Sequence, residues 1–143
     1  MAKKEQDIRF GKFGTKSFTQ TTRVNDFIDH LEQGKVMYTC CKACGAHYFP
    51  PRADCSQCLT SEMEWRQVKG KGKLVSYSLL KYAPAGFEDD LPYTIALLDY
   101  DKYQVFGRLD AGLDMDEIKI GMDLSVAVNE LAEGRFNYVF RKA

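Results

Sequence analysis

Two Cys-x-x-Cys pairs constrain this chain more than any other feature of its sequence. Cys41 and Cys44 form the first pair, Cys55 and Cys58 form the second, and ten residues separate them. Each pair can present two sulfurs to one metal ion, and the intervening hairpin can bring the pairs together. The spacing therefore predicts a four-thiolate structural metal site. We favour Zn²⁺, because a closed tetrahedral sulfur shell leaves no open position for a substrate and zinc requires no redox partner.

Other uses of these cysteines receive unequal support from the sequence. An iron site of the rubredoxin type would use the same four sulfurs, and the sequence leaves that choice open. A redox dithiol is not favoured because neither pair lies near a βαβ pattern, and disulfides are not favoured because no apolar signal segment precedes them. The fifth cysteine, Cys40, is predicted to be a spare thiol, with substitution for Cys41 as the alternative. Two complete pairs leave His47 no vacancy, and Arg52 is expected either near the thiolates or exposed.

The chain of 143 residues suits one ordinary domain or two small ones. No run is apolar enough to span a bilayer or direct secretion, so we expect a cytoplasmic protein with no membrane partner. The zero net charge hides an asymmetry: residues 1–73 carry thirteen Lys or Arg against eight acids, and residues 74–143 carry seven against twelve. Strong binding to a polyanion is therefore not expected.

Residues 1–35 are predicted to be an N-terminal arm followed by a short helix. The arm contains three phenylalanines, Phe10, Phe13 and Phe18. It is either loose in isolation or anchored to a partner through these rings. Four apolar residues then follow helical spacing: Val24, Phe27, Ile28 and Leu31. Gly34 is expected to end the helix, which is too short to be stable alone. Its apolar stripe must dock either on a partner or on the rest of the chain.

Residues 36–69 are assigned to the zinc ribbon and residues 70–143 to a five-stranded β-barrel, so the predicted fold class is mainly β. The barrel strands are short, rich in β-forming residues and separated by turns: 74–80, 93–98, 104–109, 124–128 and 136–140. A hairpin turn is expected at residues 99–102 and a short helix within residues 113–118. This order suits an OB-type barrel, although an SH3-like barrel would give a similar sequence. Residues 70–73 are predicted to be a flexible boundary.

The chain resembles the zinc-ribbon plus OB-fold family that accompanies acyl-CoA enzymes, known as domain-of-unknown-function family thirty-five. The residues that carry the resemblance are 41–45 (Cys-x-x-Cys-Gly), 49–52 (Phe-Pro-Pro-Arg), Cys55, Cys58, Gly70, Gly72 and 120–122 (Ile-Gly-Met). The resemblance implies a noncatalytic partner of a thiolase-like catalytic chain in a hetero-oligomer, contributing to assembly and to the CoA or acyl-CoA site. Ser56 and Leu59 depart from the Pro and Gly common in this family, and Leu tolerates a left-handed turn poorly.

The residues themselves argue against catalysis by this chain alone. A thiolase needs a nucleophilic cysteine with acid–base partners, and Cys40 is the only cysteine outside the predicted metal shell. The alternative function is single-stranded nucleic-acid binding, which zinc ribbons and OB barrels also perform. Several aromatic residues of the barrel half could supply stacking surfaces, but the net acidic charge of that half opposes this function. The long loop at residues 82–92 is expected either to contact the partner and border its acyl-CoA entrance or to be a solvated loop.

Overall fold

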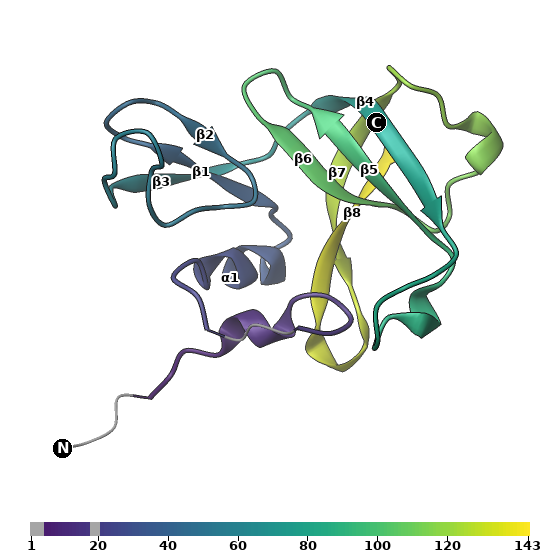
Figure 1. Cartoon of the computed structure of the whole chain (residues 1–143), viewed down its shortest axis with the longest axis horizontal. Coiled ribbons are helices and arrows are strands. Elements are labelled where there is room, and N and C mark those ends of the chain that lie inside the picture. The colour runs from purple at the N-terminus through teal and green to yellow at the C-terminus, as the bar shows by residue number, and fades with distance from the viewer. Residues whose placement is uncertain (1–4, 18–20) are drawn as a thin grey trace.

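A computed structural model describes residues 5–17 and 21–143 of the chain and shows a small three-stranded sheet beside a closed β-barrel (Figure 1). The one α-helix in the described ranges, α1 (Asp26–Glu32), lies below the small sheet and beside the barrel. Among the described residues, no helix has the length and apolar character that crossing a bilayer requires.

The small sheet consists of β1 (Met37–Cys41), β2 (His47–Tyr48) and β3 (Met63–Gln67), in the antiparallel order β2-β1-β3. All five residues of the central strand β1 are buried. Tyr38 on β1 stacks on Tyr103 in the hairpin between barrel strands, with ring centroids 4.2 Å apart. The two modules therefore share a packed contact rather than a flexible linker.

The barrel contains the five predicted strands, closed in the order β4-β5-β6-β8-β7 with β6 and β8 parallel. Their bounds are β4 (Lys71–Leu80), β5 (Tyr93–Asp99), β6 (Gln104–Leu109), β7 (Asp123–Glu130) and β8 (Phe136–Lys142). Within residues 5–17 and 21–143, four 3-10 turns complete the secondary structure: η1 (Arg9–Lys12), η2 (Glu88–Asp90), η3 (Met115–Glu117) and η4 (Ala132–Gly134). The turn η3 falls within the short helix predicted at residues 113–118.

Strand β5 shows how the sequence pattern produces the barrel. Thr94, Ala96 and Leu98 are buried and alternate with half-buried neighbours, as expected when one face of a strand points into a closed core. Two glycines permit close packing: an added Cβ would lie 2.6 Å from Tyr100 at Gly72 and 2.7 Å from Tyr138 at Gly107. Residues 71–73 lie in β4 and pair with β7, and Lys73 also pairs with β5, so most of the stretch predicted to be a flexible boundary at residues 70–73 is part of the barrel.

The helix stripe packs on the chain itself. Phe27, Ile28 and Leu31 are almost fully buried, whereas Val24 precedes the helix. The ring of Phe27 lies between rings from three other parts of the chain, with centroids 5.8 Å from Phe13 and 6.3 Å from Tyr138 on β8. The arm therefore adds to an internal aromatic cluster, and the stripe docks on the chain's own core. The third arm phenylalanine, at position 18, lies outside the described residues.

Candidate metal centre

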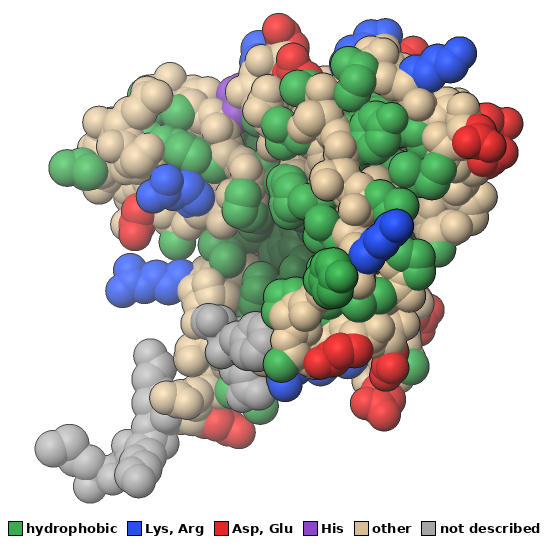
Figure 2. All heavy atoms as spheres, turned by 45° about the vertical axis from the view of Figure 1, so that its right-hand side comes forward, with side chains coloured by type: hydrophobic (Ala, Val, Ile, Leu, Met, Phe, Trp, Pro, Cys, Tyr) green, Lys and Arg blue, Asp and Glu red, His purple; other side chains and the backbone are tan. Residues whose placement is uncertain are grey.

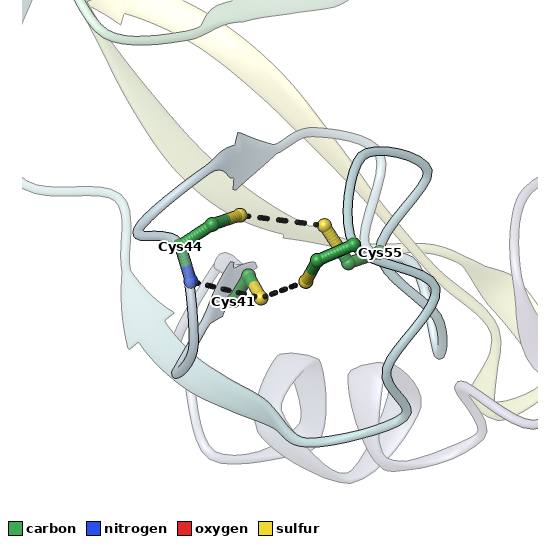
Figure 3. Close-up of side chains that lie close together, drawn as sticks. Cys41, Cys44 and Cys55 are labelled. Atoms are coloured by element: carbon green, nitrogen blue, oxygen red, sulfur yellow. Dashed lines mark hydrogen bonds between the residues drawn. The ribbon is translucent and has the colours of Figure 1, made fainter.

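The four predicted sulfurs converge. The Sγ atoms of Cys41, Cys44, Cys55 and Cys58 all lie within 4.8 Å of one another. We call the turn that carries each Cys-x-x-Cys pair a knuckle. Two of the sulfur–sulfur distances between the first knuckle and the second are shorter, at 3.3 Å from Cys41 to Cys58 and 3.6 Å from Cys44 to Cys55. Figure 3 shows the first knuckle facing the second across this short gap. A tetrahedral zinc with Zn–S bonds of about 2.3 Å requires sulfurs about 3.8 Å apart, so the arrangement fits Zn²⁺.

Both knuckles are built by the same backbone turn. The amide of Gly45 donates to the carbonyl of Cys41 over 2.9 Å, and the amide of Leu59 donates to the carbonyl of Cys55 over 3.0 Å. Each turn ends with a left-handed residue, with φ of 77° at Gly45 and 61° at Leu59. Glycine adopts this conformation without strain, but leucine does not. Leu59 nevertheless adopts the same left-handed turn as Gly45, and it is 83% exposed.

Electrostatics differ between the sulfurs of the second knuckle. The hydroxyl of Tyr48 donates to the Sγ of Cys55 over 3.2 Å, and this hydrogen bond lowers the pKa of Cys55 to about 6. The hydrogen bond that Cys58 shares with the sulfur of Cys41 instead favours the protonated thiol and raises the pKa of Cys58 to about 12. A divalent cation favours the thiolate form and allows all four thiols to ionise. The chemistry of the donor set is therefore that of a metal site.

Other predicted residues lie outside the sulfur cluster. Cys40 is buried but its side chain is not among the four converging sulfurs. His47 also stays outside the cluster, and burial, together with Arg66 and Lys102, lowers its pKa. Arg52 is exposed and lies over the ring of Tyr48 at 5.3 Å.

Sequence reasoning missed Tyr48, whose hydroxyl reaches the cluster. Its hydroxyl also accepts a hydrogen bond from the Ser56 amide over 3.1 Å, which places it against the start of the second knuckle. The only signal in the sequence was its position on the hairpin between the two pairs. No spacing rule distinguishes this tyrosine from its neighbours, since its role depends on how β2 turns toward Cys55.

The loop at residues 82–92 forms one wall of a groove of about 520 Å³ on the barrel. Phe87, Tyr93 and Arg108 line it, and residues 13–16 of the arm also contribute to its lining. Apolar side chains gather on this side of the barrel, with acidic side chains at its lower edge (Figure 2). Within the loop, Asp90 accepts a 2.6 Å hydrogen bond from Thr15 and forms a 2.9 Å ion pair with Arg108. Asp90, one of three consecutive acidic residues at positions 88–90, therefore has a structural role.

The fold and the sulfur cluster together define a zinc ribbon joined to an OB-fold barrel. Family models agree: residues 29–64 match the ChsH2 rubredoxin-like zinc ribbon domain, and residues 65–129 match the ChsH2 C-terminal OB-fold domain. The chain belongs to the DUF35 family, as its similarity to curated relatives also shows.

Two archaeal relatives carry the name "DUF35 domain-containing scaffold protein". The relative from Methanocaldococcus jannaschii is 33% identical over 95 residues, which cover 65% of this chain and 67% of the relative. The relative from Methanothermobacter thermautotrophicus is 27% identical over 106 residues, which cover 71% of this chain and 80% of the relative.

Solved structures show the same two-module arrangement. A chain from the "Ltp2-ChsH2(DUF35) aldolase" superposes with a TM-score of 0.71 at 26% identity, covering 87% of this chain and 98% of that one. A DUF35 protein of unknown function from Sulfolobus solfataricus superposes with a TM-score of 0.54 at 18% identity, covering 83% of this chain and 84% of that one. The second match supports the fold alone.

Proposed function

We propose that this chain is a noncatalytic zinc-binding subunit of a thiolase-like acyl-CoA enzyme. Cys41, Cys44, Cys55 and Cys58 hold the Zn²⁺, and the metal fixes the two knuckles relative to each other. Four protein sulfurs complete the tetrahedral shell, so the ion supplies folding energy rather than a site for substrate. The catalytic cysteine and its acid–base partners belong to the other chain of the hetero-oligomer.

One observation carries this proposal: the chain superposes over almost the whole length of a chain solved as part of an Ltp2-ChsH2(DUF35) aldolase. That name joins a second component to the DUF35 chain and assigns an activity that breaks carbon–carbon bonds. The curated relatives are called scaffold proteins, which suits an assembly role. Thiolases also break carbon–carbon bonds, and the resemblance to the family of acyl-CoA companions favours a thioester substrate.

The more specific proposal is the small subunit of benzoylsuccinyl-CoA thiolase, an enzyme of anaerobic toluene degradation. The sequence resemblance supports this assignment. The groove lined by Phe87, Tyr93 and Arg108 would then border the partner's acyl-CoA entrance. Apolar and aromatic walls suit an aromatic acyl group, and Arg108 already stacks on Tyr93, with its guanidinium 3.9 Å from the ring centroid.

Co-expression with a thiolase-family chain tests the proposal. We expect the two chains to elute together in size-exclusion chromatography, and CoA-dependent cleavage of a 3-oxoacyl-CoA to require both. Cleavage that proceeds without CoA would change the assignment from thiolase to aldolase. A chain that binds no such partner, or that cleaves the substrate unaided, would refute the subunit role.

The groove is tested in the same complex. Phe87→Ala combined with neutral amides at Glu88 and Asp89 should raise the KM or weaken assembly, whereas Asp90 is left intact because of its ion pair with Arg108. Ile120→Ala is the control for loss of an exposed apolar side chain, because Ile120 is 61% exposed and does not line the groove. Unchanged assembly and KM in the loop variant would make residues 82–92 an ordinary solvated loop.

A further inference from the structure

A second pocket lies at one end of the barrel, where β4 and β6 end and β5 begins. It has a volume of about 420 Å³. Strands and the turn η3 give it apolar walls, with Leu79 on β4, Leu109 on β6, Met115 on η3 and Val139 on β8. Pockets of this size with mainly apolar walls bind small molecules, and the few polar groups in them decide which molecule fits.

The charged side chains that line this pocket are already paired within the chain. Asp90 forms its 2.9 Å ion pair with Arg108, and Asp110 forms a 2.8 Å ion pair with Arg141. An ionic ligand would therefore leave water for an apolar pocket that offers no free counter-charge, which is costly. The pocket favours a neutral ligand.

Two asparagine side chains in the same pocket lack partners. Asn129 on β7 and Asn137 on β8 lie directly opposite each other in the β7–β8 ladder, so their side chains project from the same face. The Oδ1 atom of Asn137 is buried and accepts no hydrogen bond from the described residues, and the carboxamide of Asn129 makes none with them either. Buried polar groups are nearly always hydrogen-bonded. This pair of carboxamides therefore requires a partner that the chain does not supply.

Thr94 adds a third polar group to the pocket. It is 5% exposed, and its hydroxyl donates to the thioether sulfur of Met115 over 3.5 Å. A thioether is a weak acceptor, so the hydroxyl can rotate toward a better one at little cost. The pocket thus offers two carboxamides and one hydroxyl to a ligand.

We propose that this pocket binds a small neutral molecule in which a primary carboxamide or a lactam is attached to an apolar body. An asparagine carboxamide presents an N–H donor beside a C=O acceptor, and it pairs with a group that carries the same two functions along one edge. Primary amides and lactams are such groups. The apolar body of the ligand would contact Leu79, Met115 and Val139.

The pocket adjoins the groove beside the loop at residues 82–92, since Tyr93, Arg108 and Asn137 are among the residues that line both. Asn129 and Thr94 line the pocket and not the groove, so the hydrogen-bonding groups that select the ligand lie mainly in the pocket. The proposal goes beyond the subunit role, because it concerns a ligand of this chain alone, whatever reaction the partner catalyses.

Three probes built on one benzene ring test the ligand class with the full zinc-loaded chain. Benzamide has both the donor and the acceptor, N,N-dimethylbenzamide keeps the acceptor but has no N–H, and benzoate is charged. We expect benzamide to bind with a Kd of about 1 mM, as suits a molecule of its size. The other two should bind about tenfold more weakly or worse, because each leaves a polar group of the pocket unpaired. NMR signals of the Asn129 and Asn137 side-chain amides follow the binding and locate the probe.

Asn137→Leu separates a binding role from a structural one. It keeps the approximate size of the side chain and removes an unpaired carboxamide, so benzamide binding should be lost while the urea midpoint stays the same or rises. Asn129→Leu should also weaken binding, so the test does not depend on the folding of one variant. The matched control is Asn25→Leu, because Asn25 is buried outside the pocket and its amide donates to the carbonyl of Thr22 over 2.6 Å. This control should keep benzamide binding and lose stability.

Four results would overturn the proposal. No binding of benzamide would make water the partner of Asn137. Equal affinity for benzamide and N,N-dimethylbenzamide would show that the N–H donor is not recognised, and tighter binding of benzoate would show that the pocket takes an anion. Undiminished benzamide binding by Asn137→Leu would place the ligand elsewhere. Because no partner chain is present, these results do not depend on whether the subunit role is correct.

Discussion

Truncating Phe27 tests whether the helix stripe stabilises this chain or serves a partner. The Phe27 side chain is 3% exposed. Its ring centroid lies 6.3 Å from Phe10, 5.8 Å from Phe13, 6.4 Å from Phe49 and 6.3 Å from Tyr138. These rings come from the arm, the ribbon hairpin and the barrel. Phe27→Ala therefore leaves a cavity at the point where all parts of the chain meet.

The expected loss is large. Replacing a buried phenylalanine with alanine lowers the free energy of unfolding by about 3–5 kcal/mol, and lost contacts between aromatic rings place this site toward the upper end. With a urea m-value of about 2 kcal/mol/M, the midpoint should fall by about 1.5–2.5 M. The assay is urea unfolding of the isolated chain, followed by circular dichroism with zinc in excess so that metal loss does not contribute.

The control is Tyr82→Ala, because Tyr82 is 90% exposed and its loss should change stability by less than about 0.5 kcal/mol. Phe27→Leu should retain most of the stability, since it keeps an apolar side chain of similar volume. Phe27→Ala could instead leave the urea midpoint of the isolated chain unchanged and prevent complex formation. That result would show that the apolar stripe of the helix faces a partner and does not stabilise this chain.

Four further substitutions address the metal centre and the barrel. Cys44→Ser should remove bound zinc, measured by metal analysis, and unfold the ribbon because about 10–16 kcal/mol of metal-binding energy is linked to folding. Cys40→Ser should keep the metal; loss of zinc from Cys40→Ser alone would shift the ligand set by one residue. Leu59→Gly should raise the free energy of unfolding by about 0.5–1 kcal/mol, because glycine relieves the left-handed strain at the cost of greater unfolded-state entropy; a lower melting temperature would contradict this. Burial raises the pKa of Asp90, but hydrogen bonds from Thr15 and Arg108 outweigh it and hold the pKa below its ordinary value of 3.8. Its stabilising contribution is therefore complete above that value and lost as the pH falls through the lower folded pKa, and Asp90→Asn should flatten this part of the curve of stability against pH.

The sequence was sufficient where the controlling interactions are local. Cys-x-x-Cys spacing specifies a knuckle because two sulfurs three residues apart reach one metal ion, and the structure brings all four sulfurs within 4.8 Å. Residues that are buried at every second position, such as Thr94, Ala96 and Leu98, specify a strand because successive side chains of a strand point to opposite faces. All five barrel strands and the poor fit of Leu59 to its left-handed turn follow from such short-range rules.

Tertiary structure decided what depends on contacts between distant residues. The sequence showed that the stripe containing Phe27 must dock, but only the fold shows that it docks on Tyr138 and the arm. Tyr48 joins the sulfur cluster because β2 turns its hydroxyl toward Cys55, which no pattern of residue types encodes. Asn137 likewise lines a pocket that is assembled from strands distant in the sequence. Periodicity defines which face of a strand is apolar, whereas the path of the chain through space defines which neighbour lies beside it.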